Sequence, residues 1–145
     1  MKKVILIIIV CILLLTGCTN NSIKKNSSKE ENKKMSNVKV TINDKTYKLV
    51  LEDNSTAHEF INLLPKEFIM DELNGNEKYV YIDTSLETNS YNSKHIEKGD
   101  VMIFGDNCLV IFYESFDTSY SYTKIGHIDN LENLGDGTIT VKFEK

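Results

Sequence analysis

Residues 99–126 read GDVMIFGDNCLVIFYESFDTSYSYTKIG, and the rest of the fold is arranged around this stretch. It contains two apolar runs, residues 101–104 and 108–113, which are separated by Gly105-Asp106-Asn107. Apolar runs on either side of a glycine-containing turn predict two strands joined as a hairpin. The second run leads into a segment rich in serine, threonine and tyrosine. We therefore place the centre of the folded domain here.

Further strands are predicted on both sides of this hairpin. Apolar and polar residues alternate in residues 38–42 and 47–51, which flank an Asn-Asp-Lys turn and predict another hairpin. Asn74-Gly75-Asn76 is a strong turn signal. The remaining strands are predicted at residues 67–73, with Phe68 and Met70 directed inward, at residues 78–82, and at residues 138–143. Residues 124–129 fit either a strand or a short turn, and the polar residues 83–98 predict a long loop.

One short helix is predicted between the second and third strands. Residues 53–56 offer several N-cap residues, and Thr56 and Glu59 have the spacing of a capping box, in which each side chain bonds a free N–H group of the first turn. Ala57, Phe60, Ile61 and Leu64 fall on one helical face, and Pro65 predicts that the helix ends at Leu64. Residues 131–134 could add one further helical turn. The sequence thus predicts a mainly β domain, a small closed barrel of about eight strands with one or two short helices.

The first 18 residues have the pattern of an export signal. Lys2 and Lys3 precede an apolar run, residues 4–15, that is shorter than the about 20 apolar residues a membrane-spanning helix requires. The run ends in Leu-Thr-Gly-Cys, which resembles the bacterial lipobox, and this resemblance implies a diacylglyceryl group on Cys18. The alternative is an ordinary signal peptide with a chance cysteine. We expect a signal peptide at residues 1–17, a lipidated cysteine and flexible tether at 18–36, and a folded domain at 37–145.

The tether and the anchor together predict a location. Residues 19–36 are polar and have too little apolar surface to offset the entropy of an ordered chain. Their lysines could also attract anionic lipid headgroups, although a solvated linker explains them as well. We expect a lipid-anchored domain on a bacterial cell membrane, facing outside the cytoplasm.

Charge and cysteine content exclude several functional classes. Without Lys2 and Lys3, 15 lysines face 21 acidic residues, a formal charge of −6, and the chain contains no arginine. An acidic domain without arginine is a poor match for nucleic acid, whose phosphates dominate the affinity of its partners. Once Cys11 leaves with the leader and Cys18 carries lipid, Cys108 has no partner for a disulfide. Cys108 opens an apolar strand, and we expect a buried thiol there rather than a nucleophile.

Catalytic and metal-binding motifs are weak in this sequence. His58, His95 and His127 lack metal-ligand spacing, so we interpret them as surface histidines and expect no cofactor. Ser119 or Ser121 could be combined with His127 and Asp129 as a hydrolase triad, but no nucleophile-elbow motif supports that combination. The acidic residues Asp71, Glu72, Asp100 and Asp106 do not form a calcium-binding loop either.

A cluster of aromatic and small polar residues is the best candidate for a binding site. Tyrosine combines an apolar ring with a polar tip, which suits a groove that binds a peptide or a small ligand. The alternative is that about half of these rings fill the barrel and its ends. The candidate groove residues are Tyr91, Asn92, Tyr113, Phe116, Ser119, Tyr120 and Tyr122.

Several longer motifs can be recognised along the chain, among them Leu63-Leu64-Pro65, the run 73–79 and Ser119-Tyr120-Ser121-Tyr122. Together they resemble the bacterial cyclophilin-like domain family over most of residues 38–143. The resemblance implies a barrel of about eight strands with a helix over one end, and it implies no particular activity. True cyclophilins isomerise proline peptide bonds with an arginine, and this chain has none to take that role. We therefore expect non-catalytic binding of a peptide, protein or small ligand. The alternatives are a proline isomerase for exported proteins and a structural partner in an envelope assembly.

Overall fold

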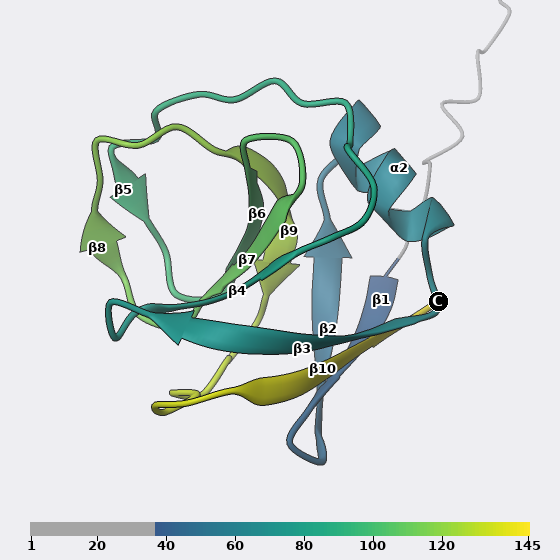
Figure 1. Cartoon of the computed structure of the whole chain (residues 1–145), viewed down its shortest axis with the longest axis vertical. Coiled ribbons are helices and arrows are strands. Elements are labelled where there is room, and N and C mark those ends of the chain that lie inside the picture. Colours follow the sequence, from purple (N-terminus) through teal and green to yellow (C-terminus); the bar gives the residue numbers. More distant parts are fainter. Residues whose placement is uncertain (1–36) are drawn as a thin grey trace, which may run out of the picture. The chain divides into compact units, whose positions relative to one another are not determined.

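Eight antiparallel strands close into a barrel in the computed structural model, which describes residues 37–145 (Figure 1). The signal peptide, the tether and the lipidated Cys18 predicted from the sequence lie outside the described residues. Around the barrel the strands follow the order β1-β10-β3-β4-β7-β6-β9-β2. They are β1 (Asn37–Ile42), β2 (Lys45–Leu51), β3 (Lys66–Leu73), β4 (Glu77–Tyr81), β6 (Asp100–Phe104), β7 (Cys108–Phe112), β9 (Thr123–Ile128) and β10 (Ile139–Glu144). The mainly β class and the closed barrel predicted from the sequence are confirmed.

The predicted hairpins are present with the expected turns. β6 and β7 pair through Phe104 and Cys108 on either side of the Gly105-Asp106-Asn107 turn. Asn74 and Gly75 both have positive φ in the tight connection between β3 and β4, as such turns require. The sequence left strand and turn open for residues 124–129, and all of these but the last lie in β9, which pairs with both β2 and β6. This strand is what closes the barrel.

The long loop predicted at residues 83–98 contains a short strand. β5 (His95–Ile96) pairs with β8 (Phe116–Asp117) as a two-stranded sheet outside the barrel. Figure 1 shows this pair beside β6 and β7, on the side away from β1 and β10. A second link joins the same two segments, because Tyr91 and Tyr122 exchange backbone hydrogen bonds of 3.0 and 3.1 Å. We call residues 91–98 and 114–122 the flap.

The helix begins at one of the N-cap residues that the sequence offers, but its capping and its end differ from the prediction. α2 (Ser55–Asn62) is capped by Asn54, whose side chain accepts a hydrogen bond from the Ala57 N–H. The predicted Thr56–Glu59 capping box is therefore wrong. Both of its side chains instead bind the backbone of Glu87, Thr56 donating to the carbonyl and Glu59 accepting from the N–H. The helix ends at Asn62, two residues before the predicted position.

No helical turn forms at residues 131–134, so α2 is the single helix of the described residues. The reason is local hydrogen bonding by Asn133. Its side-chain oxygen accepts a bond from the Gly135 N–H, and its amide nitrogen donates to Glu114. Side chains of this type compete with helix formation by bonding nearby backbone groups. Within residues 37–145 no helix is long and apolar enough to cross a membrane.

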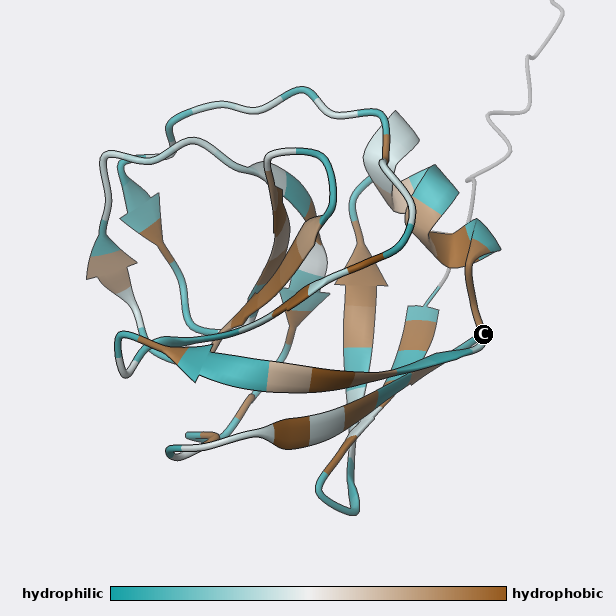
Figure 2. Ribbon diagram, viewed as in Figure 1, coloured by the Kyte–Doolittle hydropathy of each residue, from teal (hydrophilic) through white to brown (hydrophobic). Residues whose placement is uncertain are grey.

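Apolar residues cover two separate sides of β6 and β7. Val101, Ile103, Leu109 and Ile111 point into the barrel and belong to its core, which α2 closes through the packing of Phe60 on Phe143. The alternate residues Met102, Cys108, Val110 and Phe112 form a second buried cluster outside the barrel, together with Ile96 and Tyr122 of the flap. Figure 2 shows the resulting apolar runs along β6 and β7. Burial on both faces explains why these strands read as unbroken apolar runs.

Candidate functional site

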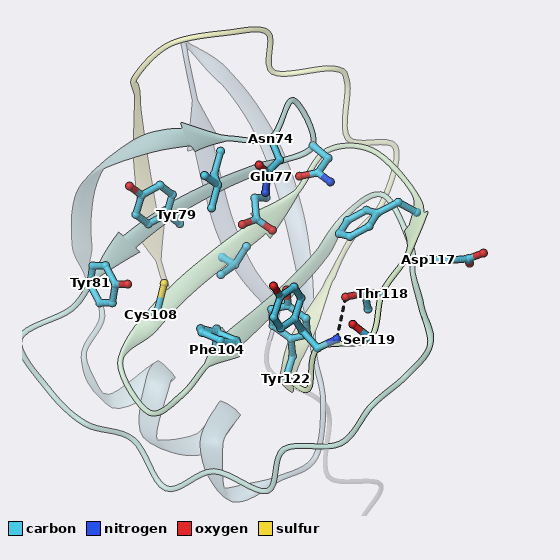
Figure 3. A pocket seen from close by; sticks show the side chains of 15 residues that line it. Asn74, Glu77, Tyr79, Tyr81, Phe104, Cys108, Asp117, Thr118, Ser119 and Tyr122 are labelled. Atoms are coloured by element: carbon cyan, nitrogen blue, oxygen red, sulfur yellow. Dashed lines mark hydrogen bonds between the residues drawn. The ribbon is translucent and has the colours of Figure 1, made fainter.

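A cavity of about 510 Å³ lies on the outer side of the barrel, between β4, β7 and the flap (Figure 3). The outward residues of β4 and β7 form its floor, and the flap forms one wall. Its size is within the range of about 300–1,000 Å³ that is usual for small-ligand sites. The lining residues are Leu73, Asn74, Asn76, Glu77, Tyr79, Tyr81, Phe104, Cys108, Val110, Phe116, Asp117, Thr118, Ser119, Tyr120 and Tyr122.

Aromatic rings make up much of this lining and hold one another in place. Tyr79 and Tyr81 lie edge to face with ring centroids 6.1 Å apart. Phe104 contacts Tyr120 at 6.0 Å and Tyr122 at 5.5 Å, so it joins the barrel to the flap. Edge-to-face pairs of this kind favour a fixed arrangement of the rings. The cavity therefore has ring surfaces that exist before any ligand arrives.

Hydrogen bonds within the flap fix the wall that it contributes. The Asn92 amide donates to the Ser119 carbonyl oxygen at 2.7 Å, and the Tyr120 N–H donates to the Thr118 hydroxyl at 3.1 Å. His95 Nδ1 lies 2.6 Å from a carboxylate oxygen of Asp117, and this hydrogen bond raises the pKa of His95. Asp117 thus reaches the cavity edge as one half of an ion pair.

Glu77 is the buried charged group of the cavity. Its side chain extends from the first residue of β4 into the space between the rings (Figure 3), and the residue is 9% exposed. Burial raises the pKa of its carboxyl to about 7, and the nearby charge of Glu72 acts in the same direction. Among the described residues, its carboxylate has no hydrogen-bond or ion-pair partner, and its oxygens are open to the cavity.

The two other charged side chains nearby do have partners. Glu72 accepts hydrogen bonds from the Gly75 N–H and, at 3.2 Å, from the Tyr113 hydroxyl. Lys78 points to the opposite side of β4 and donates to the carbonyl oxygens of Gly135 and Gly137, each at 2.6 Å. Glu77 differs from both because its carboxylate faces only the cavity.

Cys108 and Tyr122 stand beside Glu77 with little tendency to ionise. Burial raises the pKa of the Cys108 thiol, and the charge of Glu77 raises it further. Burial and the same charge raise the pKa of Tyr122 to about 12. A thiol that resists ionisation is a poor nucleophile, so the geometry favours the buried structural role expected for Cys108.

The structure brings together some of the residues selected from the sequence and separates others. Phe116, Ser119, Tyr120 and Tyr122 line the cavity. Tyr113 lies instead in the barrel core, where it is 1% exposed. Two residues support the flap without lining the cavity: Asn92 through its bond to Ser119, and Tyr91 through its backbone pairing with Tyr122.

Sequence reasoning missed the half of the cavity that β4 and β7 provide. Glu77, Tyr79 and Tyr81 alternate along β4 and therefore share its outer face. Alternation in the predicted strand 78–82 puts Tyr79 and Tyr81 on one face, and extending the strand by one residue includes Glu77 on that face. The covering of this face by the flap had no sequence signal.

The other candidate sites are not assembled in the structure. His127 bonds Asp100 through Nδ1 at 2.9 Å and lies 3.9 Å from Asp129 through Nε2, while neither Ser119 nor Ser121 is among its partners. The serine triad considered from the sequence is therefore wrong. Asp100 is buried, and its carboxylate also forms an ion pair with the Lys124 ammonium at 2.8 Å. These contacts give Asp100 a structural role. Within residues 37–145, no group of three or more histidine, cysteine or acidic side chains could hold a metal ion.

A family model places the chain among known proteins. The model of the cyclophilin-like family matches residues 40–144, which is nearly all of the barrel. The chain belongs to the cyclophilin-like family. Searches of curated proteins and of solved structures each found no match. Membership of the cyclophilin-like family agrees with the closed barrel and its single helix, and it leaves the chemistry of the cavity to be argued from the residues themselves.

Proposed function

We propose that this cyclophilin-like domain binds a peptide, protein or small ligand in the cavity beneath the flap and does not catalyse a reaction on it. The observation that carries the proposal is the cavity itself, with aromatic rings already in place and a volume suited to a small ligand or a few side chains of a peptide. The lack of any arginine in the chain argues against proline isomerisation by the route that true cyclophilins use.

The experiment that tests the proposal is exchange NMR on a proline-containing tetrapeptide in the presence of the full chain, held in uncharged detergent micelles. We expect no acceleration of cis–trans exchange, together with chemical-shift changes at cavity residues such as Tyr120 and Phe116. Acceleration at substoichiometric protein would overturn the non-catalytic part and favour the isomerase alternative. Shift changes confined to residues outside the cavity would overturn the proposed site.

The proposal also includes a lipid anchor that holds the domain outside the cytoplasm of a bacterial cell. Its support is the charged start, the apolar run and the Leu-Thr-Gly-Cys motif that ends at Cys18. Replacing Cys18 with alanine should release the protein from the membrane fraction. The matched control is Cys108→Ala, which changes a buried cysteine of the barrel and should remain in the membrane fraction. Retention of the Cys18→Ala protein in the membrane would contradict the anchor.

A further inference from the structure

The cavity carries negative charge and no positive charge of its own. Among the residues that the structure describes, its lining contains two carboxylates, Glu77 and Asp117, and no lysine or histidine side chain. Asp117 is paired with His95 at 2.6 Å and is largely exposed, so much of its charge is balanced. Glu77 is buried and has no such partner among the described residues. An anionic ligand would meet Glu77 without any compensating cation.

A buried carboxylate without a partner is costly to a folded protein. Removing a charge from water costs free energy unless an opposite charge or hydrogen-bond donors replace the water. The Glu77 oxygens are not among the fully buried side-chain atoms that lack a partner, so they stay open to the cavity, and a partner can reach them from there. Here neither Glu72 nor Lys78 supplies a partner, since the bonds of both go elsewhere. A bound cation would supply the missing partner.

The rings around Glu77 favour one kind of cation. Tyr79, Tyr81, Phe104, Tyr120 and Tyr122 all line the same cavity, and the faces of such rings attract organic cations. Their apolar surfaces also favour a ligand that has a hydrocarbon part. A hydrated metal ion has no such part. Val110 and Cys108 extend this apolar floor. The lining therefore matches a charged nitrogen carried on an aliphatic chain.

We propose that the cavity recognises an alkylammonium group, which pairs with the Glu77 carboxylate while the surrounding tyrosine and phenylalanine rings contact its hydrocarbon chain. This inference rests on the proposed binding function and specifies the chemistry of its ligand. The group can be a free aliphatic amine or the side chain of a peptide lysine, since both present the same ammonium on a four-carbon chain.

The test is a titration of the full chain, in uncharged detergent micelles, with matched probes followed by NMR. The charged probe is n-butylammonium and its neutral counterpart is n-butanol; N-acetyl-lysine methylamide and N-acetyl-norleucine methylamide form the peptide pair. We expect each charged probe to bind at least tenfold more tightly than its neutral counterpart, with shifts at the cavity residues. Tighter binding of the free amine identifies a small amine as the source, and tighter binding of the lysine derivative identifies a peptide.

The Glu77→Gln variant removes the charge and keeps the shape of the side chain, so it should weaken n-butylammonium binding at least tenfold and leave n-butanol unaffected. The matched control is Glu87→Gln, at an exposed position that does not line the cavity, which should bind as the unmodified chain does. The pH dependence needs no variant at all. From pH 8.5 to pH 5.5 the affinity for n-butylammonium should fall about 30-fold, because a carboxyl with a pKa of about 7 is then mostly protonated.

Equal affinity for n-butylammonium and n-butanol at the cavity would overturn the inference and leave the proposed binding function standing. Absence of cavity shifts with every probe would also overturn the inference, while the proposed function is decided separately by the proline-peptide experiment. Equal affinity of the unmodified chain and of Glu77→Gln for n-butylammonium would show that Glu77 is not the group that pairs with the cation.

Discussion

Glu77 and Lys78 are neighbours on β4, both are buried, and their surroundings are opposite. Lys78 enters the barrel, donates to two backbone carbonyl oxygens and has its ammonium 5.2 Å from the centre of the Tyr113 ring. Glu77 faces outward into the cavity, where no described residue bonds its carboxylate. Burial alone therefore does not identify a functional residue. The presence or absence of partners separates a structural charge from one that is available to a ligand.

The comparison extends to the rings on the two sides of the barrel wall. Tyr113 lies in the core with its hydroxyl bonded to Glu72, whereas Tyr120 lies at the cavity and is 63% exposed. The largest effect on stability is expected inside. Tyr113→Ala should lower the free energy of unfolding by about 4 kcal/mol, because it removes a buried ring and leaves a cavity. Urea unfolding measures this, and a loss below about 1 kcal/mol would contradict the assignment of Tyr113 to the core.

Replacing Lys78 tests whether its charge is structural. Lys78→Met keeps the length of the side chain and leaves the Gly135 and Gly137 carbonyl oxygens without their donor, so the free energy of unfolding should fall by about 3 kcal/mol. The matched control is Lys66→Met at an exposed position of β3, which should change the same quantity by less than about 0.5 kcal/mol. Equal urea midpoints for the two variants would show that the internal bonds of Lys78 contribute nothing.

Glu77→Gln should raise the free energy of unfolding, and the size of this increase should depend on pH. The pKa of this carboxyl rises from 4.5 to about 7 on folding, so the folded chain holds a proton more tightly than the unfolded chain. Stability of the unmodified chain should fall as the pH rises from about 4.5 to 7, and the variant should escape this loss. Because solvent in the open cavity screens part of this effect, the variant should be more stable by about 1 to 2 kcal/mol at pH 8 and nearly equal at pH 4.5. Urea unfolding at both pH values measures the difference, and equal stability at pH 8 would contradict the buried, unpaired carboxylate.

The smallest effect on stability is expected at Tyr120. Tyr120→Ala removes an exposed ring, so the free energy of unfolding should change by less than about 1 kcal/mol. The same change should abolish detectable binding of n-butylammonium, because Tyr120 is part of the cavity wall and contacts Phe104. Thermal unfolding and an NMR titration on one sample compare the two quantities. A parallel loss of stability and binding would assign Tyr120 to packing.

More of the fold than of the candidate site could be predicted from the sequence. Alternation in β1, β2, β3 and β4 and the glycine-containing turns were enough for the barrel, because those patterns depend on neighbours in the sequence. The capping of α2 was mispredicted because Thr56 and Glu59 bind Glu87, which lies far along the chain. The cavity depends on the same kind of distant contact. The sequence marked Tyr120 and Tyr122 as candidates but carried no sign that the flap would enclose Glu77.

The most direct test of this account is the titration of the Glu77 side-chain carboxyl carbon by ¹³C NMR, with and without n-butylammonium. We expect a midpoint near pH 7 in the free protein, because burial raises the pKa of this carboxyl to about 7. We also expect a lower midpoint with the amine bound, since a nearby cation favours the ionised form. A midpoint near 4.5 that the amine does not move would mean that Glu77 is solvated and does not pair with the bound ammonium.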